Sequence, residues 1–308
     1  MKNYDKYHLE EAFSNRIINI YSLIPENNMV SISGGGTAMV EHIIKRVATK
    51  LQECPFVKGI ALGGSRATGT ATEISDIDIG IYYERSIDFD QLNNIAKQLD
   101  DTHRENLICR EGEWGSWVNG GGWLIIDGYH VDFILRDVER VKECVAQTDR
   151  GVISSHYQPG HPHAYINVMY RGELASSKIL YARDHDITEL KSQAEIYPDS
   201  LKEALISFFL FEAKFSCSLA KNYSRDNDLY YIIGHLFRSI SALNQVLFAA
   251  NDIYCLNEKK ATLRIGSFTI APIDYRNRVN EIFSLASEDI IISIYKLEQL
   301  CNEIEKNG

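Results

Sequence analysis

The sequence predicts an α/β region followed by an all-α region in a chain of 308 residues. Up to about residue 195, short apolar runs that end in glycine-rich turns alternate with helix-like segments, which is typical of a sheet covered by helices. Beyond Tyr197-Pro198, apolar residues recur at three- and four-residue intervals, which predicts a helical bundle. We therefore expect two domains, residues 1–195 and residues 196–308.

The composition is that of an ordinary soluble globular protein, with 45% hydrophobic and 24% charged residues. The sequence shows neither a long apolar run nor a basic stretch before an apolar core, so we expect no transmembrane helix, no secretory signal and a cytoplasmic location. The six cysteines lie far apart, which argues against zinc ligands and disulfides. A net charge of −10 makes nucleic acid an unlikely partner and suits a neutral or cationic small substrate.

The N-terminal part shows helix-like spacing over residues 4–24 and 38–52. The segment ISGGGTAM between them predicts a flexible turn. It resembles a dinucleotide-binding loop only weakly, because its three glycines are contiguous and no later glycine completes the pattern.

The predicted elements of the α/β region follow in chain order as VKGIALGG (strand and turn), IDIGIYY (strand), DFDQLNNIAKQLDD (helix), WLIID and HVDFILR (strands) and DVERVKECVAQ (helix). Asp127-Gly128 between the last two strands is a hairpin signal. The bundle is predicted from three segments, SLKEALISFFLFEAKFSCSLAKN, LYYIIGHLFRSISALNQVLFAAN and SEDIIISIYKLEQLCNEIEKN. Within them, the run FFLFEAKF and Tyr230-Tyr231 are interpreted as bundle core.

Two aspartates open the strand IDIGIYY. Residues i and i+2 of a strand point to the same side, so Asp76 and Asp78 are expected on one face while Ile77 and Ile79 face the core. Two such carboxylates lie roughly 5 Å apart and repel each other, so they add nothing to fold stability unless a divalent cation binds between them. A solvated strand end is the alternative interpretation of an isolated pair.

A third carboxylate, Asp132, is the polar residue in the strand HVDFILR. If this strand lies beside IDIGIYY, Asp132 comes next to Asp76 and Asp78. Three oxygen ligands without cysteine favour magnesium or manganese over zinc.

The glycine turn before these acids predicts a phosphate site. Gly63 and Gly64 allow positive φ and a close approach of the backbone to a phosphate. Ser65 offers a hydroxyl and an N–H group, and Arg66 adds a permanent charge, although it is equally suited to pair with a nearby acid. Phosphates beside paired carboxylates are the arrangement that phosphoryl or nucleotidyl transfer requires.

With GGSRATGTATEISDID followed by VDFILRD, the chain resembles the polymerase-β-like nucleotidyltransferase superfamily over roughly residues 38–140. Within it the chain resembles the aminoglycoside and lincosamide antibiotic-modifying enzymes, which join such a domain to a C-terminal helical bundle. The segments WGSWVNGGGWL, QPGHPHAY, YRGEL and LNEKKA are similar to a bacterial group of unassigned substrate. The resemblance implies an α/β (α+β) nucleotidyltransferase domain with a mixed sheet.

The resemblance also implies ATP or another nucleoside triphosphate, bound with Mg²⁺ or Mn²⁺. It assigns Asp76, Asp78 and Asp132 to metal binding and catalysis, and Gly64 and Ser65 to the terminal phosphates. Gly63 and Arg66 are phosphate-binding candidates from the turn itself. The metal lowers the pKa of the acceptor hydroxyl.

Two further residues are candidates for roles found in related enzymes, the general base and a lysine that binds the triphosphate. Glu173 is a candidate general base, with Asp132 as the alternative base and a helix N-terminal acid as the structural interpretation of Glu173. Lys259 is a candidate for binding the triphosphate, with Lys260 as a less favoured substitute and a solvated surface lysine as the alternative.

The segment EGEWGSWVNGGGW places three tryptophans among glycines, and we assign Trp117 and Asn119 to a substrate-facing wall. The alternative is an aromatic edge packed on the hairpin. His156, His161 and His163 are interpreted as a polar loop rather than a metal site, and His161 is a candidate substrate contact.

The leading functional hypothesis is a metal-dependent transfer of AMP from ATP to a hydroxyl of a small molecule, such as an aminoglycoside-like cation, with release of pyrophosphate. The alternatives are a protein AMPylase of a toxin-antitoxin pair and a nucleotide-sensing module without turnover. Transfer to an RNA end is disfavoured by the acidic charge. The sequence makes no prediction of oligomeric state.

Overall fold

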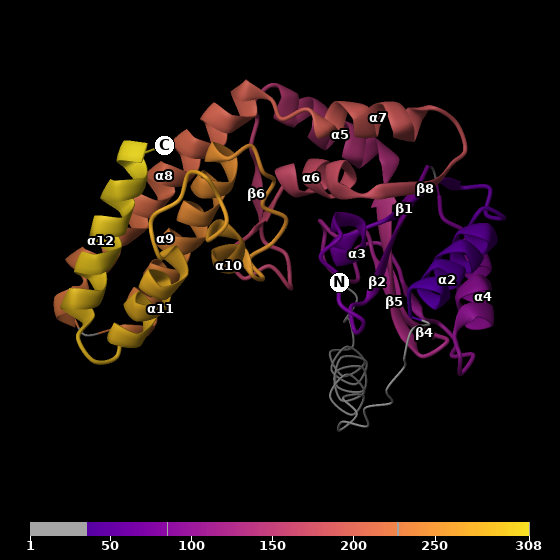
Figure 1. Cartoon of the computed structure of the whole chain (residues 1–308), viewed down its shortest axis with the longest axis horizontal. Coiled ribbons are helices and arrows are strands. Elements are labelled where there is room, and N and C mark those ends of the chain that lie inside the picture. The colour runs from indigo at the N-terminus through magenta and orange to yellow at the C-terminus, as the bar shows by residue number, and fades with distance from the viewer. Residues whose placement is uncertain (1–35, 85, 227, 308) are drawn as a thin grey trace, which may run out of the picture. The chain divides into compact units, whose positions relative to one another are not determined.

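The computed structural model describes residues 36–84, 86–226 and 228–307, so the helix expected over residues 4–24 lies outside the described part. Residues 42–308 form one compact unit, and the fold described below is that of this unit (Figure 1). The first described helix, α2, spans Gly36–Leu51. The prediction of a flexible turn over ISGGGTAM is therefore wrong for its last four residues, because Gly36–Met39 form the first turn of this helix.

A six-stranded mixed sheet is the centre of the α/β region. Its strands lie in the order β3-β4-β5-β2-β1-β8. They are β1 (Val57–Leu62), β2 (Ile77–Tyr83), β3 (Ile108–Cys109), β4 (Gly121–Ile126), β5 (Tyr129–Asp137) and β8 (Lys178–Ala182). β2 and β5 are parallel, whereas every other neighbouring pair is antiparallel. The expectation that the Asp132 strand lies beside IDIGIYY is confirmed.

The hairpin between β4 and β5 is also confirmed. Its two turn residues, Asp127 and Gly128, have φ values of 50° and 80°. Positive φ at both central positions is the geometry whose twist matches that of the flanking strands, and Asp-Gly is a favoured pair for it.

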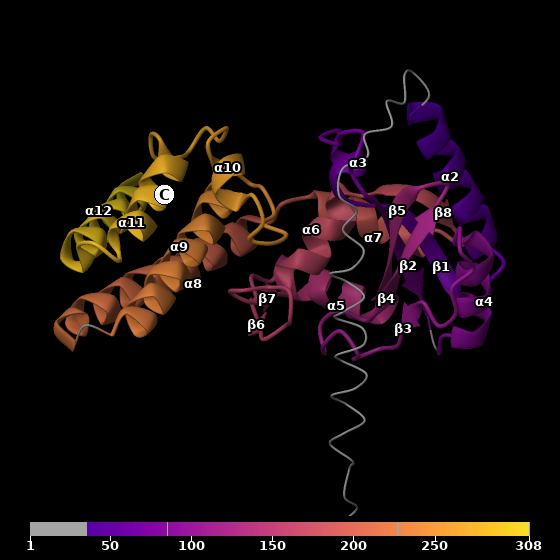
Figure 2. The same ribbon diagram turned by 90° about the horizontal axis from the view of Figure 1, so that it is seen from below.

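Helices cover both faces of the sheet (Figures 1 and 2). α4 (Phe89–Leu99) and the part of α2 beyond residue 41 lie on one face, whereas α5 (Val138–Asp149), α6 (Val168–Ser176) and α7 (Asp186–Glu195) lie on the other. The Asp88 side chain accepts a hydrogen bond from Gln91 N and begins α4. A two-residue ladder of β6 (Ser155–His156) and β7 (Tyr165–Ile166) leads into α6.

The three long helices expected in the back half are confirmed as α8 (Asp199–Asn222), α9 (Leu229–Ala250) and α12 (Ile290–Asn307). A short 3-10 turn, η1 (Ser224–Asp226), follows α8, and two helices that the sequence did not indicate, α10 (Ala261–Ile265) and α11 (Tyr275–Leu285), precede α12. The interpretation of FFLFEAKF as core is wrong in part. Phe209 is buried, but Phe208, Phe211 and Phe215 on the same helix, and Tyr230 on α9, are exposed.

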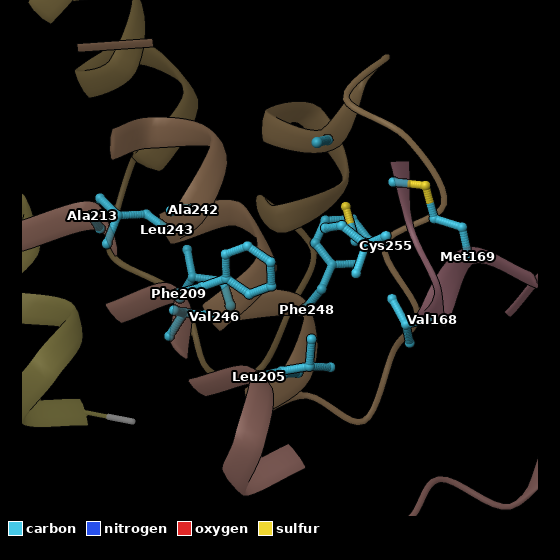
Figure 3. Close-up of a cluster of buried hydrophobic side chains, with 14 of the residues drawn as sticks. Val168, Met169, Leu205, Phe209, Ala213, Ala242, Leu243, Val246, Phe248 and Cys255 are labelled. Carbon is cyan, nitrogen blue, oxygen red and sulfur yellow. The ribbon is translucent and has the colours of Figure 1, made fainter. Parts of the chain in front are cut away.

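One apolar cluster continues from the α5–α7 layer into the bundle. Figure 3 shows Val168 and Met169 of α6 in the same group of buried side chains as Phe209 of α8 and Phe248 of α9. The predicted boundary at residue 196 falls just before α8, yet this core crosses it. The two-domain division stays a prediction.

By length and composition α9 would suffice to cross a membrane, but 72% of its apolar window is buried inside the protein. A single such helix is weak evidence, because the core helix of a bundle has the same features. The packing of α9 in the cluster described above is that of a core helix.

Arg171 of α6 connects the elements around it. Its side chain is fully buried and donates to Asp149 Oδ1 at 2.6 Å and to the carbonyl oxygens of Gln193 and Ile196, each at 2.7 Å. Its Nε donates to the hydroxyl of Tyr254, which follows α9, at 2.9 Å. A buried guanidinium is tolerated only when its donors are satisfied in this way.

We expect Arg171→Ala to lower the free energy of unfolding by about 3–5 kcal/mol, because it leaves a carboxylate and several carbonyls without their donor. Chemical denaturation measures the loss. Arg276→Ala removes an exposed arginine and is the control, expected within about 0.5 kcal/mol of wild type. An Arg171→Ala protein as stable as this control would show that the buried network contributes nothing.

Candidate active site

The parallel pairing of β2 and β5 brings two carboxylates together. Asp78 and Asp132 are direct partners in the register of the two strands, so both project from the face covered by α6. Asp76 is exposed and precedes the first residue of β2. Among the described residues, neither Asp78 nor Asp132 accepts a hydrogen bond through its carboxylate. The pair is therefore held together by the backbone and not by a local cation.

The electrostatics of the pair are unfavourable without a cation. Burial, the charge of Asp78 and the charge of Asp76 raise the pKa of Asp132 to about 7. Burial also raises the pKa of Asp78, and the charges of Asp76 and Glu173 add to this effect, while Lys259 and Arg66 oppose it. The fold therefore places negative charge where a bound cation would relieve the repulsion.

These residues fit a magnesium ion bound together with phosphates. Within residues 36–84, 86–226 and 228–307, no group of three or more His, Cys, Asp or Glu side chains is arranged to hold a metal by itself. Mg²⁺ seldom needs such a group, since it is usually bound by one or two carboxylates, substrate phosphates and water. Asp78 and Asp132 supply the two carboxylates, and the assignment of Asp76 as a further ligand stays a prediction.

The glycine turn lies directly against Asp78. Gly63 N donates to Asp78 O at 2.8 Å, and Gly64 begins the short helix α3 (Gly64–Thr68) with a φ of 59°. A Cβ atom added to Gly64 would lie 1.9 Å from Asp78 Oδ2. Only glycine satisfies both the backbone angle and this approach. Ser65 is the next residue of α3, half-buried beside this turn.

Arg66 interacts with the loop before the carboxylates. Its Nε donates to Asp76 O at 3.0 Å, and its Nη2 donates to Ser75 O. The guanidinium thereby holds the chain segment that presents Asp76. The contact of Arg66 with a phosphate stays a prediction. The alternative was a pairing with a nearby acid, and the bond that Arg66 makes to Asp76 is to its backbone carbonyl oxygen.

A cavity of about 320 Å³ opens beside the carboxylates. Its lining includes Gly63, Gly64, Asp78 and Asp132, together with Arg136 and Glu173. Segments from four parts of the chain meet here. Its wall also contains Trp114, Val118, Trp123, His161, Tyr165, Met169, Leu256 and Asn257.

Glu173 lies in the cavity wall but is held by Arg136. Arg136 Nη2 donates to Glu173 Oε2 at 2.7 Å, and Arg136 Nε lies 3.1 Å from both carboxylate oxygens. Burial opposes the charge of Arg136, yet the attraction of Glu173 raises the pKa of the guanidinium. Glu173 is the sixth residue of α6, so the interpretation as an N-terminal helix acid is wrong.

Lys259 lies within electrostatic reach of Asp78, whose pKa its charge lowers. The lysine is exposed and precedes α10 by two residues, with Lys260 at the helix cap. This position agrees with a lysine that reaches over the cavity, although its contact with a triphosphate stays a prediction.

The three histidines have separate surroundings. His156 stacks on Trp117, with ring centroids 3.6 Å apart, and His163 Nε2 lies 3.0 Å from Glu212 Oε1. His161 lines the cavity, with Nδ1 3.7 Å from Glu258 Oε2.

Trp117, a predicted substrate contact, is not part of the cavity lining. Among the described residues, the lining contains Trp114 and Trp123 but neither Trp117 nor Asn119. Asn119 Oδ1 accepts from Asp137 N and from the Tyr170 hydroxyl, each at 3.2 Å, and so serves the packing of the loop. The substrate roles of Trp117 and Asn119 stay predictions without a place in this cavity.

Sequence reasoning missed Arg136, Tyr165, Trp114 and Trp123. The sequence did hold a signal for Trp123. The two-residue turn at Asp127-Gly128 fixes the register of the hairpin, and this register pairs Trp123 with Asp132. Arg136 follows Asp132 at an interval of four and therefore shares its face of β5.

We expect Gly64→Ala to reduce turnover by about 100-fold or more, because the new methyl group displaces the Asp78 carboxylate. Gly69→Ala is the matched control, since Gly69 also has a positive φ, of 73°, but a Cβ atom there meets nothing within 4 Å. Steady-state kinetics and thermal unfolding of both variants separate the steric clash with Asp78 from the strain of a positive φ at alanine. Equal activity in the two variants would contradict the close approach.

We expect Asp132→Asn to stabilise the metal-free protein at pH 8 by about 1–3 kcal/mol. A raised pKa means that this carboxyl contributes stability below its unfolded pKa near 4, which is lost as the pH rises through about 7. Thermal unfolding in a chelator at pH 5 and pH 8 measures the difference. The stability gap between variant and wild type should grow with pH and shrink when Mg²⁺ is added, and a gap independent of both would refute the charge repulsion.

Comparison with known proteins agrees with this geometry. Residues 45–109 match the sequence model of the family described as Polymerase beta, Nucleotidyltransferase. The matched stretch contains the glycine turn, Asp76 and Asp78, and it ends before Asp132. No curated protein matches the chain.

Two solved structures show a distant likeness. A nucleotidyltransferase-like protein from Exiguobacterium sibiricum 255-15 is 10% identical, with a TM-score of 0.42, over 86% of this chain and 74% of that chain. The E. coli MS115-1 CdnC:HORMA-deltaN complex is 11% identical, with a TM-score of 0.26, over 94% of this chain and 97% of that chain. Neither likeness is strong enough to carry an argument. From the family match and the observed sheet, the predicted superfamily, fold class and enzyme class are confirmed, and the chain contains a nucleotidyltransferase domain of the polymerase-β type.

Proposed function

We propose that the protein transfers a nucleoside monophosphate, AMP from ATP, to a hydroxyl group of a small molecule and releases pyrophosphate. The observation that carries this proposal is the placement of Asp78 and Asp132 as direct strand partners, with Gly63 and Gly64 against Asp78. Phosphates at the turn and a hydroxyl near Asp132 would be the two reactants on either side of the carboxylates.

The chain's own residues have distinct tasks in this scheme. The backbone at Gly64 and Ser65 binds the terminal phosphates, and Lys259 adds a positive charge within electrostatic reach of Asp78. Asp78 and Asp132, with Asp76, hold the divalent cation. When bound, that cation neutralises the phosphate charge and lowers the pKa of the acceptor hydroxyl.

In the reaction, the acceptor oxygen forms a bond with the α-phosphorus, and the bond from that phosphorus to the pyrophosphate oxygen breaks. The hydroxyl proton passes to a carboxylate. Asp132 is favoured for this role over Glu173, because both oxygens of Glu173 already accept hydrogen bonds from Arg136.

The cavity supports a small acceptor. Its volume of about 320 Å³ accommodates one or two rings. Asp78, Asp132 and Glu173 line it with only Arg136 as a permanent positive charge among the described lining residues. This balance suits a cationic or neutral acceptor, with an aminoglycoside-like compound as one example.

We expect Asp78→Ala to reduce transfer by about 1,000-fold or more while the fold survives, because the cation and the phosphates lose a fixed carboxylate. Release of pyrophosphate from ATP, GTP, CTP and UTP with Mg²⁺, against a panel of hydroxylated metabolites and antibiotics, measures the activity. Asp90→Ala, which removes an exposed acid from α4, is the matched control and should behave as wild type. Turnover retained by Asp78→Ala would end the proposal.

The class of acceptor is decided by incubating a cell lysate with the protein and ATP labelled at the α-phosphate. Label in the small-molecule fraction supports the proposal. A labelled protein band would instead indicate protein AMPylation, and ATP binding without any pyrophosphate release would indicate a sensing module.

A further inference from the structure

We propose that the cavity is the acceptor site and that Trp123, stacked on Trp114, holds the ring of a neutral or cationic hydroxylated acceptor, such as a sugar, an aminocyclitol or a nucleoside. This inference rests on the proposed function, since it names the group that receives the nucleotide. It assigns Trp114, Trp123 and Tyr165, which neither the sequence motifs nor the family match identify, and it keeps His161, which the sequence already made a candidate substrate contact.

The position of Trp123 follows from strand register. Trp123 of β4 is the direct partner of Asp132 on β5, and Asp132 is the partner of Asp78 on β2. Gly63 then pairs with Asp78 through the hydrogen bond described above. These four residues form one row across the sheet, with the phosphate turn at one end and an indole at the other. The carboxylates lie between, so a group on Trp123 approaches them from the side opposite the phosphates.

The next row on the same face explains why a hollow exists. It consists of Ala61, Gly80, Ile134 and Gly121, each paired with its neighbour across the sheet. Because two of these residues are glycines and one is an alanine, little side-chain volume rises from this row. The rows on either side carry larger side chains, the carboxylates on one side and Tyr82 paired with Arg136 on the other. At Gly121 the missing side chain is replaced by the ring of Trp114, since a Cβ atom there would lie 2.8 Å from that ring.

The two indoles form a platform. Their ring centroids are 4.5 Å apart, with an interplanar angle of 28°, and both rings line the cavity. The inner ring is fixed at its backbone, because Trp114 O accepts a hydrogen bond from Gln158 Nε2. Trp123 nevertheless keeps 52% of its surface exposed. An exposed indole face beside a reacting centre binds the apolar face of a sugar or a nucleobase.

Two polar atoms of the cavity wall make no hydrogen bond within the described residues, and the second of them, on His161, faces Glu258 Oε2 at 3.7 Å. They are the hydroxyl of Tyr165, a residue only 2% exposed, and Nδ1 of His161. A buried polar atom without a hydrogen bond costs free energy, which a polar ligand recovers. These atoms belong to the segment QPGHPHAY and lie in the same cavity as the platform. They suit the hydroxyl, amino or ring-nitrogen groups of the proposed acceptors.

The charge of the cavity argues against an anionic acceptor. Arg136 is the only Lys or Arg among the described lining residues, and its donors are taken by Glu173 and by Leu135 O. A phosphorylated acceptor would find no free permanent cation there, and the carboxylates nearby repel it. The site is therefore expected to discriminate between an acceptor and its phosphate ester.

The experiment measures pyrophosphate release from ATP and Mg²⁺ with matched pairs of acceptors, adenosine and AMP, and glucosamine and glucosamine 6-phosphate. The unphosphorylated member of a pair should have the higher kcat/KM by about tenfold or more. Trp123→Ala should raise the KM for that acceptor about tenfold, with the KM for ATP within about twofold of wild type, and Trp123→Phe should largely restore it. Tyr230→Ala, which removes an exposed aromatic ring from α9, is the control for loss of a surface ring.

Tyr165→Phe tests the cavity wall without loss of packing. It should raise the acceptor KM about fivefold and leave the melting temperature unchanged or higher, because an unpaired hydroxyl is removed. An equal rise in the KM for ATP in Trp123→Ala would overturn the inference and assign the platform to the nucleotide. Equal use of the phosphate esters would overturn it as well, as would a KM effect at Trp117→Phe with none at Trp123.

Binding without turnover separates this inference from the proposed function. Quenching of tryptophan fluorescence by adenosine and by glucosamine requires no chemistry. Quenching that Trp123→Phe diminishes, in a protein that releases no pyrophosphate with any acceptor, would refute the proposed transfer and retain a ring-binding site. No quenching by either ring, together with no transfer to either, would refute the inference.

Discussion

The short helix α6 is the constraint on which the rest of the structure depends, because four consecutive residues of it serve four different neighbours. The Tyr170 hydroxyl donates to Trp117 O and to Asn119, and thereby fixes the tryptophan loop. Arg171 ties α5, the end of α7 and the chain after α9. Gly172 lets Tyr254 approach, since a Cβ atom at this glycine would lie 2.4 Å from the Cβ of that tyrosine. Glu173 faces the cavity and orients Arg136. The helix thus joins sheet and bundle on one side of the carboxylates.

The paired carboxylates lower the stability of the fold, whereas the contacts of α6 raise it. Asp78 and Asp132 are direct partners in a parallel strand pair, and the charge of Asp78 raises the free energy of ionising Asp132. The cost is borne by the backbone hydrogen bonds of the sheet and by the buried apolar residues Ile77, Ile79 and Phe133 on the opposite side of the strands. A fold that keeps repelling charges in register has a rigid site before any ligand binds, which is the condition for electrostatic catalysis.

Much of this arrangement was predictable from local patterns. Alternation along β2 and β5, the Asp-Gly turn and the spacing of the bundle helices each express one strong local preference, and these predictions are confirmed. Three features were not predictable, because they depend on long-range contacts. β8 joins the edge of the sheet more than 100 residues after β1. Phe208, Phe211 and Phe215 look like core in sequence but lie on the outer face of α8. Tyr165 and Leu256 reach one cavity only through the packing of α6 against the bundle.

Strand spacing has a consequence for the outcome of the reaction. Neighbouring strands lie about 4.8 Å apart, so an acceptor stacked on Trp123 meets the carboxylate on the adjoining strand at a distance fixed by the sheet. The ring cannot slide along this direction without losing the indole face. The position of transfer would then depend on which hydroxyl oxygen of the acceptor ring reaches the carboxylate on the adjoining strand while the ring stays stacked on the indole. Compounds of different composition that share this projection would be modified at equivalent positions.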